Sequence, residues 1–195
     1  MIPNDPASLS TRRAAVATLA TGLAAWSTST LAQQGTPAPW PEVAAQLPNA
    51  LYSGSARLRF WGFEVYDAQL WIDPNFRTSR LGAHPLALSL TYLRTLRGKA
   101  IAERSVTEMR RQGPLAAEQE AQWLAEMTRV FPDVAANDRL TGLWQPGQGA
   151  RFWFNAAPRG TIADDVFASR FFGIWLHEAT SEPDMRRALL AKAPA

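Results

Sequence analysis

The chain has 195 residues, of which 47% are hydrophobic and 19% charged, a composition that excludes an intrinsically disordered protein and suits one globular domain. The formal net charge of +3 comes almost entirely from arginine, and acidic residues are interspersed throughout, so no basic stripe predicts a nucleic-acid partner. The absence of cysteine excludes disulfides, thiol catalysis and cysteine-ligated metals.

The first 32 residues have the organisation of a cleavable export signal. An arginine pair, Arg12 and Arg13, precedes an apolar stretch over 14–26, and small residues follow it. This stretch is too short to cross about 30 Å of hydrocarbon as a stable helix, so we expect a signal peptide over 1–32 and no stable membrane span. The residues before the arginine pair resemble the twin-arginine motif, which leaves that export route open beside the general secretory one. The mature protein is expected to be periplasmic or otherwise exported.

The mature chain is expected to begin with a flexible lead-in over 33–50, followed by one folded domain over 51–192. Residues 51–62 alternate apolar residues with arginines and predict either two strands or one strand bent at Gly62. Residues 63–73 predict a further strand. Phe63, Val65 and Trp71 fall on one of its faces, and Tyr66, Leu70 and Ile72 fall on the other. Neither face is polar throughout, so something must cover each side of this strand.

The rest of the chain alternates between groups of strands and groups of helices. Residues 86–93 predict a third strand, and the apolar spacing then changes to that of two helices, over 98–113 and 116–131. A hairpin over 140–155 follows, with a second turn at "APRG", and two more helices are expected from Asp164 or Asp165 onward. This order predicts an α+β fold with an antiparallel sheet arranged as a meander and helices gathered on it.

Motifs of common enzyme classes are missing from the sequence. The nucleophile elbow GxSxG does not occur, and the two histidines, His84 and His177, lie far apart without a metal-ligand spacing. No glycine loop has the pattern of a phosphate or dinucleotide cradle. We therefore expect no metal and no cofactor.

Aromatic residues gather in the strand-like segments beside several arginines. Most of these aromatics would form the core of any such domain. The alternative is a pocket with apolar walls and one or two polar anchors, the usual design for holding a fatty or aromatic small molecule. An arginine beside a tyrosine hydroxyl would bind a carboxylate there through charge-assisted hydrogen bonds.

Three segments carry a resemblance to a known family: "FEVYDAQLWID", "LTYLRTLRGKAIAERSVTEMRRQG" and the stretch from "GQGARFWF" to "MRRALLA". Together they resemble the chalcone isomerase-like superfamily, in its bacterial exported branch, over residues 51–191. The resemblance implies an open-faced β-sandwich, with a large antiparallel sheet, helices packed on one face, and a ligand cleft between sheet and helices. It also implies one of two family functions, because plant chalcone isomerases cyclise chalcones without a cofactor whereas non-catalytic relatives bind fatty acids.

The family's functional residues transfer only in part. The helix that brings a tyrosine, a lysine and an asparagine to the cleft of the plant enzymes resembles a segment with Ala102, Ser105 and Met109 at those places. The strand threonine of the plant enzymes corresponds to Tyr66, and an arginine upstream would correspond to Arg57 or Arg59. Taken together, the expected ligand-binding residues are Arg57, Arg59, Tyr66, Tyr92, Ser105 and Met109.

Three functions remain open at this point. The first is non-catalytic binding of a small apolar or carboxylate ligand, such as a fatty acid or an aromatic acid. The second is a cofactor-free isomerase, or intramolecular lyase, of unknown substrate; the loss of three donors that would stabilise a phenolate-like oxygen weighs against efficient chalcone cyclisation. The third is an interaction domain of the cell envelope that holds no ligand.

Overall fold

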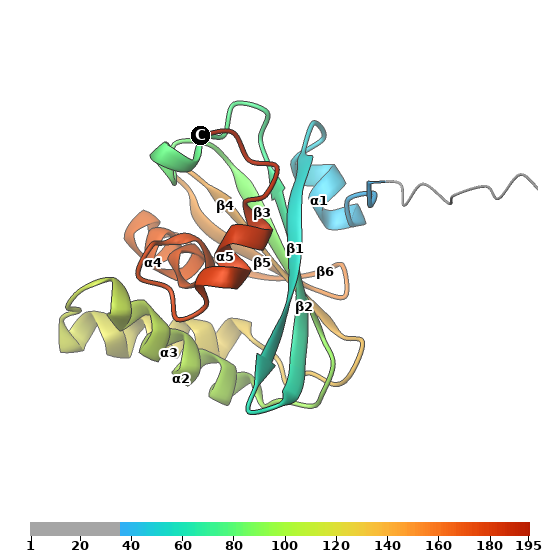
Figure 1. The fold of residues 1–195 in the computed structure, drawn as a ribbon. Coiled ribbons are helices and arrows are strands. Elements are labelled where there is room, and N and C mark those ends of the chain that lie inside the picture. The colour runs from blue at the N-terminus through green and yellow to red at the C-terminus, as the bar shows by residue number, and fades with distance from the viewer. Residues whose placement is uncertain (1–35) are drawn as a thin grey trace, which may run out of the picture. The chain divides into compact units, whose positions relative to one another are not determined.

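The structure is a computed structural model that describes residues 36–195, so the predicted signal peptide and the first residues of the lead-in lie outside the described part. Residues 36–195 form a unit of their own, built on a six-stranded antiparallel sheet whose strand order follows the chain (Figure 1). The strands are β1 (Leu51–Phe60), β2 (Phe63–Ile72), β3 (Leu86–Tyr92), β4 (Arg139–Gln145), β5 (Gly149–Phe154) and β6 (Ala157–Ile162). The predicted α+β class and the antiparallel meander are confirmed.

Four helices pack on one face of the sheet, and a shorter one lies on the other (Figure 1). The former are α2 (Gly98–Met109), α3 (Ala117–Val130), α4 (Asp165–Leu176) and α5 (Pro183–Leu189), and the latter is α1 (Pro41–Gln46). Two short 3₁₀ helices, η1 (Thr78–Arg80) and η2 (Arg110–Gln112), complete the described elements. Within residues 36–195, no helix combines the length and the hydropathy that crossing a bilayer requires.

The two faces of β2 bury two separate apolar clusters. Ala68, Leu70 and Ile72 join the large cluster beneath the helices α2–α5. Trp71 points the opposite way and joins a smaller cluster beneath α1, together with Leu143 of β4 and Trp153 of β5. The mixed alternation of this strand therefore has a simple cause: both of its faces are covered.

The lead-in differs from the expectation, because its second half contains α1. Pro41 occupies the first turn, and Val43 and Leu47, four residues apart, are buried in the smaller cluster. Glu42 is 5% exposed, accepts hydrogen bonds from Arg139 and from the hydroxyl of Thr141, and so ties the helix to β4. A helix of six residues is not stable on its own, so α1 depends on these tertiary contacts. Local sequence does not predict them.

The strand β6 also differs from the expectation, which placed only a turn at "APRG". Pro158 and Gly160 lower the strand propensity of this segment. The segment pairs with β5 alone, at the edge of the sheet, where a residue without a backbone N–H is tolerated. Residues 51–62 match neither alternative: they contain one strand, β1, which ends at Phe60, and Gly62 lies with Trp61 in a two-residue turn between the paired residues Phe60 and Phe63.

Candidate ligand-binding site

A cavity of about 290 Å³ lies between the ends of β1–β3 and the helices α2 and α4. Its lining comes from both the sheet and the helices, and most of its surface is apolar. The main apolar side chains are Leu58, Leu90, Leu96, Ile101, Phe171 and Ile174. The position agrees with the cleft that the family resemblance implies, and the composition is that of a site for a small apolar molecule.

Two local features position the helices that wall the cavity. Helix α2 begins at Gly98, whose backbone N–H donates to Asp133 Oδ1 over 2.8 Å. A Cβ at this residue would lie 2.2 Å from the carbonyl oxygen of Phe131, so only glycine allows this approach. Helix α4 begins after Asp164, whose side chain accepts the backbone N–H of Phe167 over 3.0 Å and the indole N–H of Trp123 over 2.9 Å. These contacts hold the start of α2 against the segment that follows α3, and the start of α4 against α3 itself.

Tyr66 of β2 carries one of the two phenolic hydroxyls of the cavity wall, which also includes Ser105 and Ser181. The indole Nε1–H of Trp175 donates to Tyr66 Oη over 2.9 Å, so the phenol acts as acceptor toward the protein. Its own O–H remains available to donate toward a ligand. Burial raises the pKa of Tyr66, outweighing the hydrogen bond from Trp175, which acts to lower it. The hydroxyl therefore stays protonated at neutral pH and serves as a donor.

Tyr92 of β3 carries the second hydroxyl. Tyr92 is the cross-strand partner of Tyr66, and the centroids of the two rings lie 5.9 Å apart in an edge-to-face arrangement. The side chain is 1% exposed, and burial, followed by the nearby Tyr66, raises its pKa. Within residues 36–195, Tyr92 Oη has no hydrogen-bond partner. The pair thus adds two neutral phenol groups to the wall of the cavity.

The expected residues on α2 divide between the cavity and the core. Ser105 lines the cavity, but its hydroxyl donates to the carbonyl of Ile101 over 2.8 Å, one turn earlier in the same helix. Met109 and Ala102 are fully buried, belong to the large apolar cluster and do not line the cavity. The structure therefore brings Ser105 together with the two tyrosines, and it places Met109 in the core.

Arg57 and Arg59, the expected arginine anchors, lie outside the cavity. Arg57 forms ion pairs with Asp67 over 2.6 Å and with Glu64 over 2.9 Å, and Arg59 pairs with Glu64 over 2.8 Å. These hydrogen bonds raise the pKa of Arg57 and lower that of Glu64. The physical reason is the alternation of side chains along β1, which directs Arg57 away from the face that carries Leu58.

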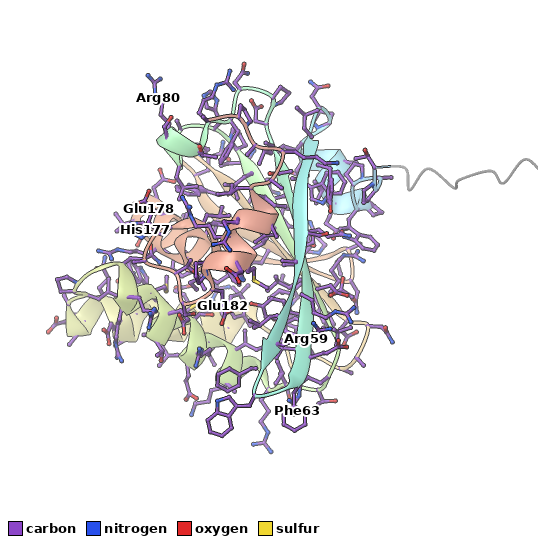
Figure 2. The ribbon with its side chains drawn as sticks, viewed as in Figure 1. Arg59, Phe63, Arg80, His177, Glu178 and Glu182 are labelled. Carbon is purple, nitrogen blue, oxygen red and sulfur yellow. The ribbon has the colours of Figure 1, made fainter. Side chains whose placement is uncertain are left out.

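Other charged residues surround the cavity instead. Arg94 follows β3, Arg104 and Glu108 lie on α2, and Glu182 precedes α5, where Figure 2 labels it. Arg104 pairs with Glu108 over 2.6 Å, one helical turn apart. Burial, with the nearby Glu108, raises the pKa of Glu182, while Arg104 opposes the shift. The sequence analysis did not include Arg104 among the expected site residues. Its spacing of three residues from Ile101 and four from Glu108 places it on the same face of α2 as these two residues, which was the available signal.

The described residues contain no group of three or more histidine, aspartate or glutamate side chains that could hold a metal ion. What the arrangement does supply is an apolar chamber, two phenolic donors at the sheet and a mixed set of charges around them. Such a chamber can enclose an apolar body and hydrogen-bond an anionic or carbonyl oxygen at its end.

Comparison with known proteins places the chain in a family. The crystal structure of a fatty-acid binding protein of Arabidopsis thaliana has the same fold, with a TM-score of 0.57 and 12% sequence identity, over 73% of this chain and 87% of that one. No functionally curated protein matches the chain. Residues 51–191 match the family described as chalcone isomerase-like, which confirms the predicted open-faced β-sandwich. The chain is therefore a member of the chalcone isomerase-like family.

Proposed function

We propose that this protein is exported and binds, without catalysis, a small apolar molecule that carries a carboxylate, such as a medium-chain fatty acid. The observation that carries the proposal is an apolar cavity of about 290 Å³ whose wall includes two neutral tyrosines from neighbouring strands. Apolar walls favour a hydrocarbon chain, and paired O–H donors favour an anionic oxygen at its end.

The size of the cavity narrows the ligand class. A dry apolar cavity of roughly 150 Å³ holds benzene, so a cavity about twice as large holds roughly a dozen non-hydrogen atoms. A saturated ten-carbon fatty acid has about that size. The similar fold of the Arabidopsis fatty-acid binding protein is consistent with such a ligand. A chain of sixteen or eighteen carbons would have to extend through the mouth of the cavity.

The absence of the plant donors supports a non-catalytic role. At the places of the tyrosine, lysine and asparagine, this chain has a fully buried alanine, a serine bonded to its own helix, and a core methionine: Ala102, Ser105 and Met109. None of the three directs a free donor into the cavity. A reaction that develops charge on an oxygen would then rely on the two tyrosines, or on Arg94 and Arg104, which also line the cavity.

Binding of decanoate to purified protein, measured by isothermal titration calorimetry, tests the proposal. The informative variant is Ala100→Trp, because Ala100 lies exposed in the first turn of α2 and lines the cavity, so an indole there would obstruct it. We expect affinity to fall at least ten-fold. Ala121→Trp, at an exposed position of α3 outside the cavity, is the matched control and should bind normally. A wild type that binds no decanoate, or an equal loss in both variants, would refute the proposal.

Export to the periplasm is the second part of the proposal and rests on residues 1–32. The arginine pair, the short apolar stretch and the small residues after it support a signal peptide that is removed. Intact-mass measurement of the protein recovered from the periplasmic fraction is the test, and we expect a chain that begins near Gln33. Recovery of the full-length chain from the cytoplasm would contradict this part while leaving the ligand proposal open to its own test.

A second candidate function is favoured by the tyrosine pair itself. Two phenolic donors in the wall of one cavity, with ring centroids 5.9 Å apart, could stabilise an oxyanion, as a cofactor-free isomerase requires. The assay is the absorbance change of a chalcone at neutral pH in the presence of wild type or Tyr66→Phe. Turnover above the buffer rate that disappears in Tyr66→Phe would establish this candidate in place of non-catalytic binding.

A further inference from the structure

The tip of the β1–β2 hairpin exposes three aromatic side chains on four consecutive residues. Phe60 is 47% exposed, Trp61 87% and Phe63 62%, whereas the other large apolar residues this exposed within residues 36–195, Leu51 and Val166, stand alone. Phe60 and Trp61 stack on each other with centroids 5.7 Å apart. Figure 2 shows Phe63 at the outer end of the hairpin, beyond the helices and the rest of the sheet. We call Phe60, Trp61 and Phe63 the aromatic tip.

The backbone conformation of the turn is unfavourable for Trp61. Trp61 and Gly62 both have positive φ, 50° and 80°, as a two-residue type I′ turn requires. Glycine and asparagine adopt this region readily, whereas a bulky side chain there is strained. Trp61 contributes nothing to the core, since almost its whole surface is exposed. An unfavourable conformation that displays an indole to solvent indicates a role for that indole at a surface.

Arginines flank the aromatic tip. The guanidinium of Arg94 lies 5.1 Å from the ring centroid of Phe63, and that of Arg104 lies 5.4 Å from the ring centroid of Phe60. Arg94 has no carboxylate within ion-pair distance among residues 36–195. Aromatic side chains beside arginines are the composition of segments that enter the headgroup region of anionic membranes, where the rings lie among the acyl chains and the guanidiniums bind phosphate.

We propose that the aromatic tip docks this protein onto a lipid bilayer that carries anionic headgroups. The site adjoins the cavity, since Phe60, Arg94 and Arg104 also line it. A docked molecule would therefore present the mouth of its cavity to the membrane surface. That consequence for an apolar ligand rests on the proposed function, whereas membrane docking itself does not depend on it.

Vesicle flotation tests the proposal with residues 36–195, which contain the whole sheet and both apolar clusters. The probes are vesicles of phosphatidylcholine alone and of phosphatidylcholine with phosphatidylglycerol. We expect wild type to float with the anionic vesicles, less so with the neutral ones, and less as salt is raised. The test variant is Trp61→Asn with Phe63→Ser, because neither residue lines the cavity and Asn before Gly62 suits the turn.

The expected result is a loss of at least about ten-fold in partitioning for the tip variant, since burying even one aromatic side chain contributes that factor. Leu51→Ser with Val166→Ser, at equally exposed apolar residues elsewhere, should float like wild type. Wild type that stays out of the floating fraction, or a tip variant that floats equally well, would overturn the proposal. So would light scattering that shows a wild-type dimer and a monomeric tip variant, because the tip would then bind a second copy. Decanoate affinity of the tip variant, measured without lipid, separates this proposal from the proposed function.

Discussion

Replacing each cavity tyrosine by phenylalanine should affect folding stability differently, although the chemical change is the same. In Tyr66→Phe the indole N–H of Trp175 loses its acceptor, the oxygen 2.9 Å away. Trp175 is only 5% exposed, so its donor stays without a partner inside the protein. A buried donor left in this way costs about 1–3 kcal/mol. Tyr92→Phe removes a hydroxyl that has no partner within residues 36–195, and this change should leave stability within about 0.5 kcal/mol of wild type.

Thermal unfolding followed by circular dichroism measures the difference. For a domain of this size, 1 kcal/mol shifts Tm by about 2–4 °C, so Tyr66→Phe should melt about 2–12 °C below wild type. Tyr92→Phe should melt close to wild type. Trp175→Phe serves as control, since it removes the donor of the same hydrogen bond. Combined with Tyr66→Phe, it should lower Tm by less than the sum of the two single shifts.

Ligand affinity should fall in both variants, because both tyrosines line the cavity and each supplies a hydroxyl to the proposed binding of a carboxylate. Each hydrogen bond to a carboxylate contributes about 1.5–3 kcal/mol, so each variant should bind decanoate at least about ten-fold more weakly. Tyr92→Phe is the decisive case, since it should lose affinity while keeping stability. A Tyr92→Phe protein that melts as low as Tyr66→Phe, or that binds decanoate like wild type, would refute the assigned role of this hydroxyl.

Three further expectations concern the frame around the cavity. Glu42→Gln should lower the free energy of unfolding by about 3 kcal/mol in urea denaturation, because it leaves the largely buried Arg139 without its charged partner. Burial would raise the pKa of Glu42, but hydrogen bonds from Arg139 and Thr141 outweigh burial and lower that pKa. The stability that the Glu42 carboxylate contributes is therefore present above its unfolded-state pKa and is lost as pH falls through its folded-state pKa. In Glu42→Gln, the free energy of unfolding should depend less on pH in this acid range. Gly54→Ala should destabilise strongly, with reduced Tm, since a Cβ there would lie 2.0 Å from the carbonyl oxygen of Ala188 in α5; an unchanged Tm would mean that α5 shifts freely. Arg57→Ala should bind decanoate like wild type, because its ion pairs lie outside the cavity, and a ten-fold loss in calorimetry would contradict that placement.

Most elements of the sheet and of its helical cover could be predicted from local patterns. Local sequence predicts strands with alternating apolar residues, such as β2 and β3, and helices with an apolar stripe, such as α3. The reason is that apolar residues repeat every two positions on one face of a strand and about every 3.6 positions on one face of a helix. The strand β6 and the helix α1 were missed for a common reason. Each is short or poor in propensity, and contacts with segments distant in the chain hold it in place.

The candidate site was predicted in part. Tyr66 and Tyr92 meet because the register of β2 and β3 makes them cross-strand partners, and Ser105 joins them from α2. Their binding role stays a prediction. The prediction for Arg57 was wrong because the direction of a side chain depends on the register of β1 against β2. The irregularities of that register lie at Tyr52/Gly54 and Leu58/Arg59, not at Gly62 as expected.

By itself, the sequence determined the class of fold, the order of its elements, the resemblance to one family and the lack of the plant donors on α2. Only the tertiary structure decided which polar side chains share the cavity, that α1 covers the second face of the sheet, and that the hairpin displays an aromatic tip. The physical reason is that the spacing of apolar residues along the chain specifies only which face of a helix or strand is apolar. What lies opposite that face depends on pairings between residues dozens of positions apart, such as Tyr66 with Trp175 and Glu42 with Arg139.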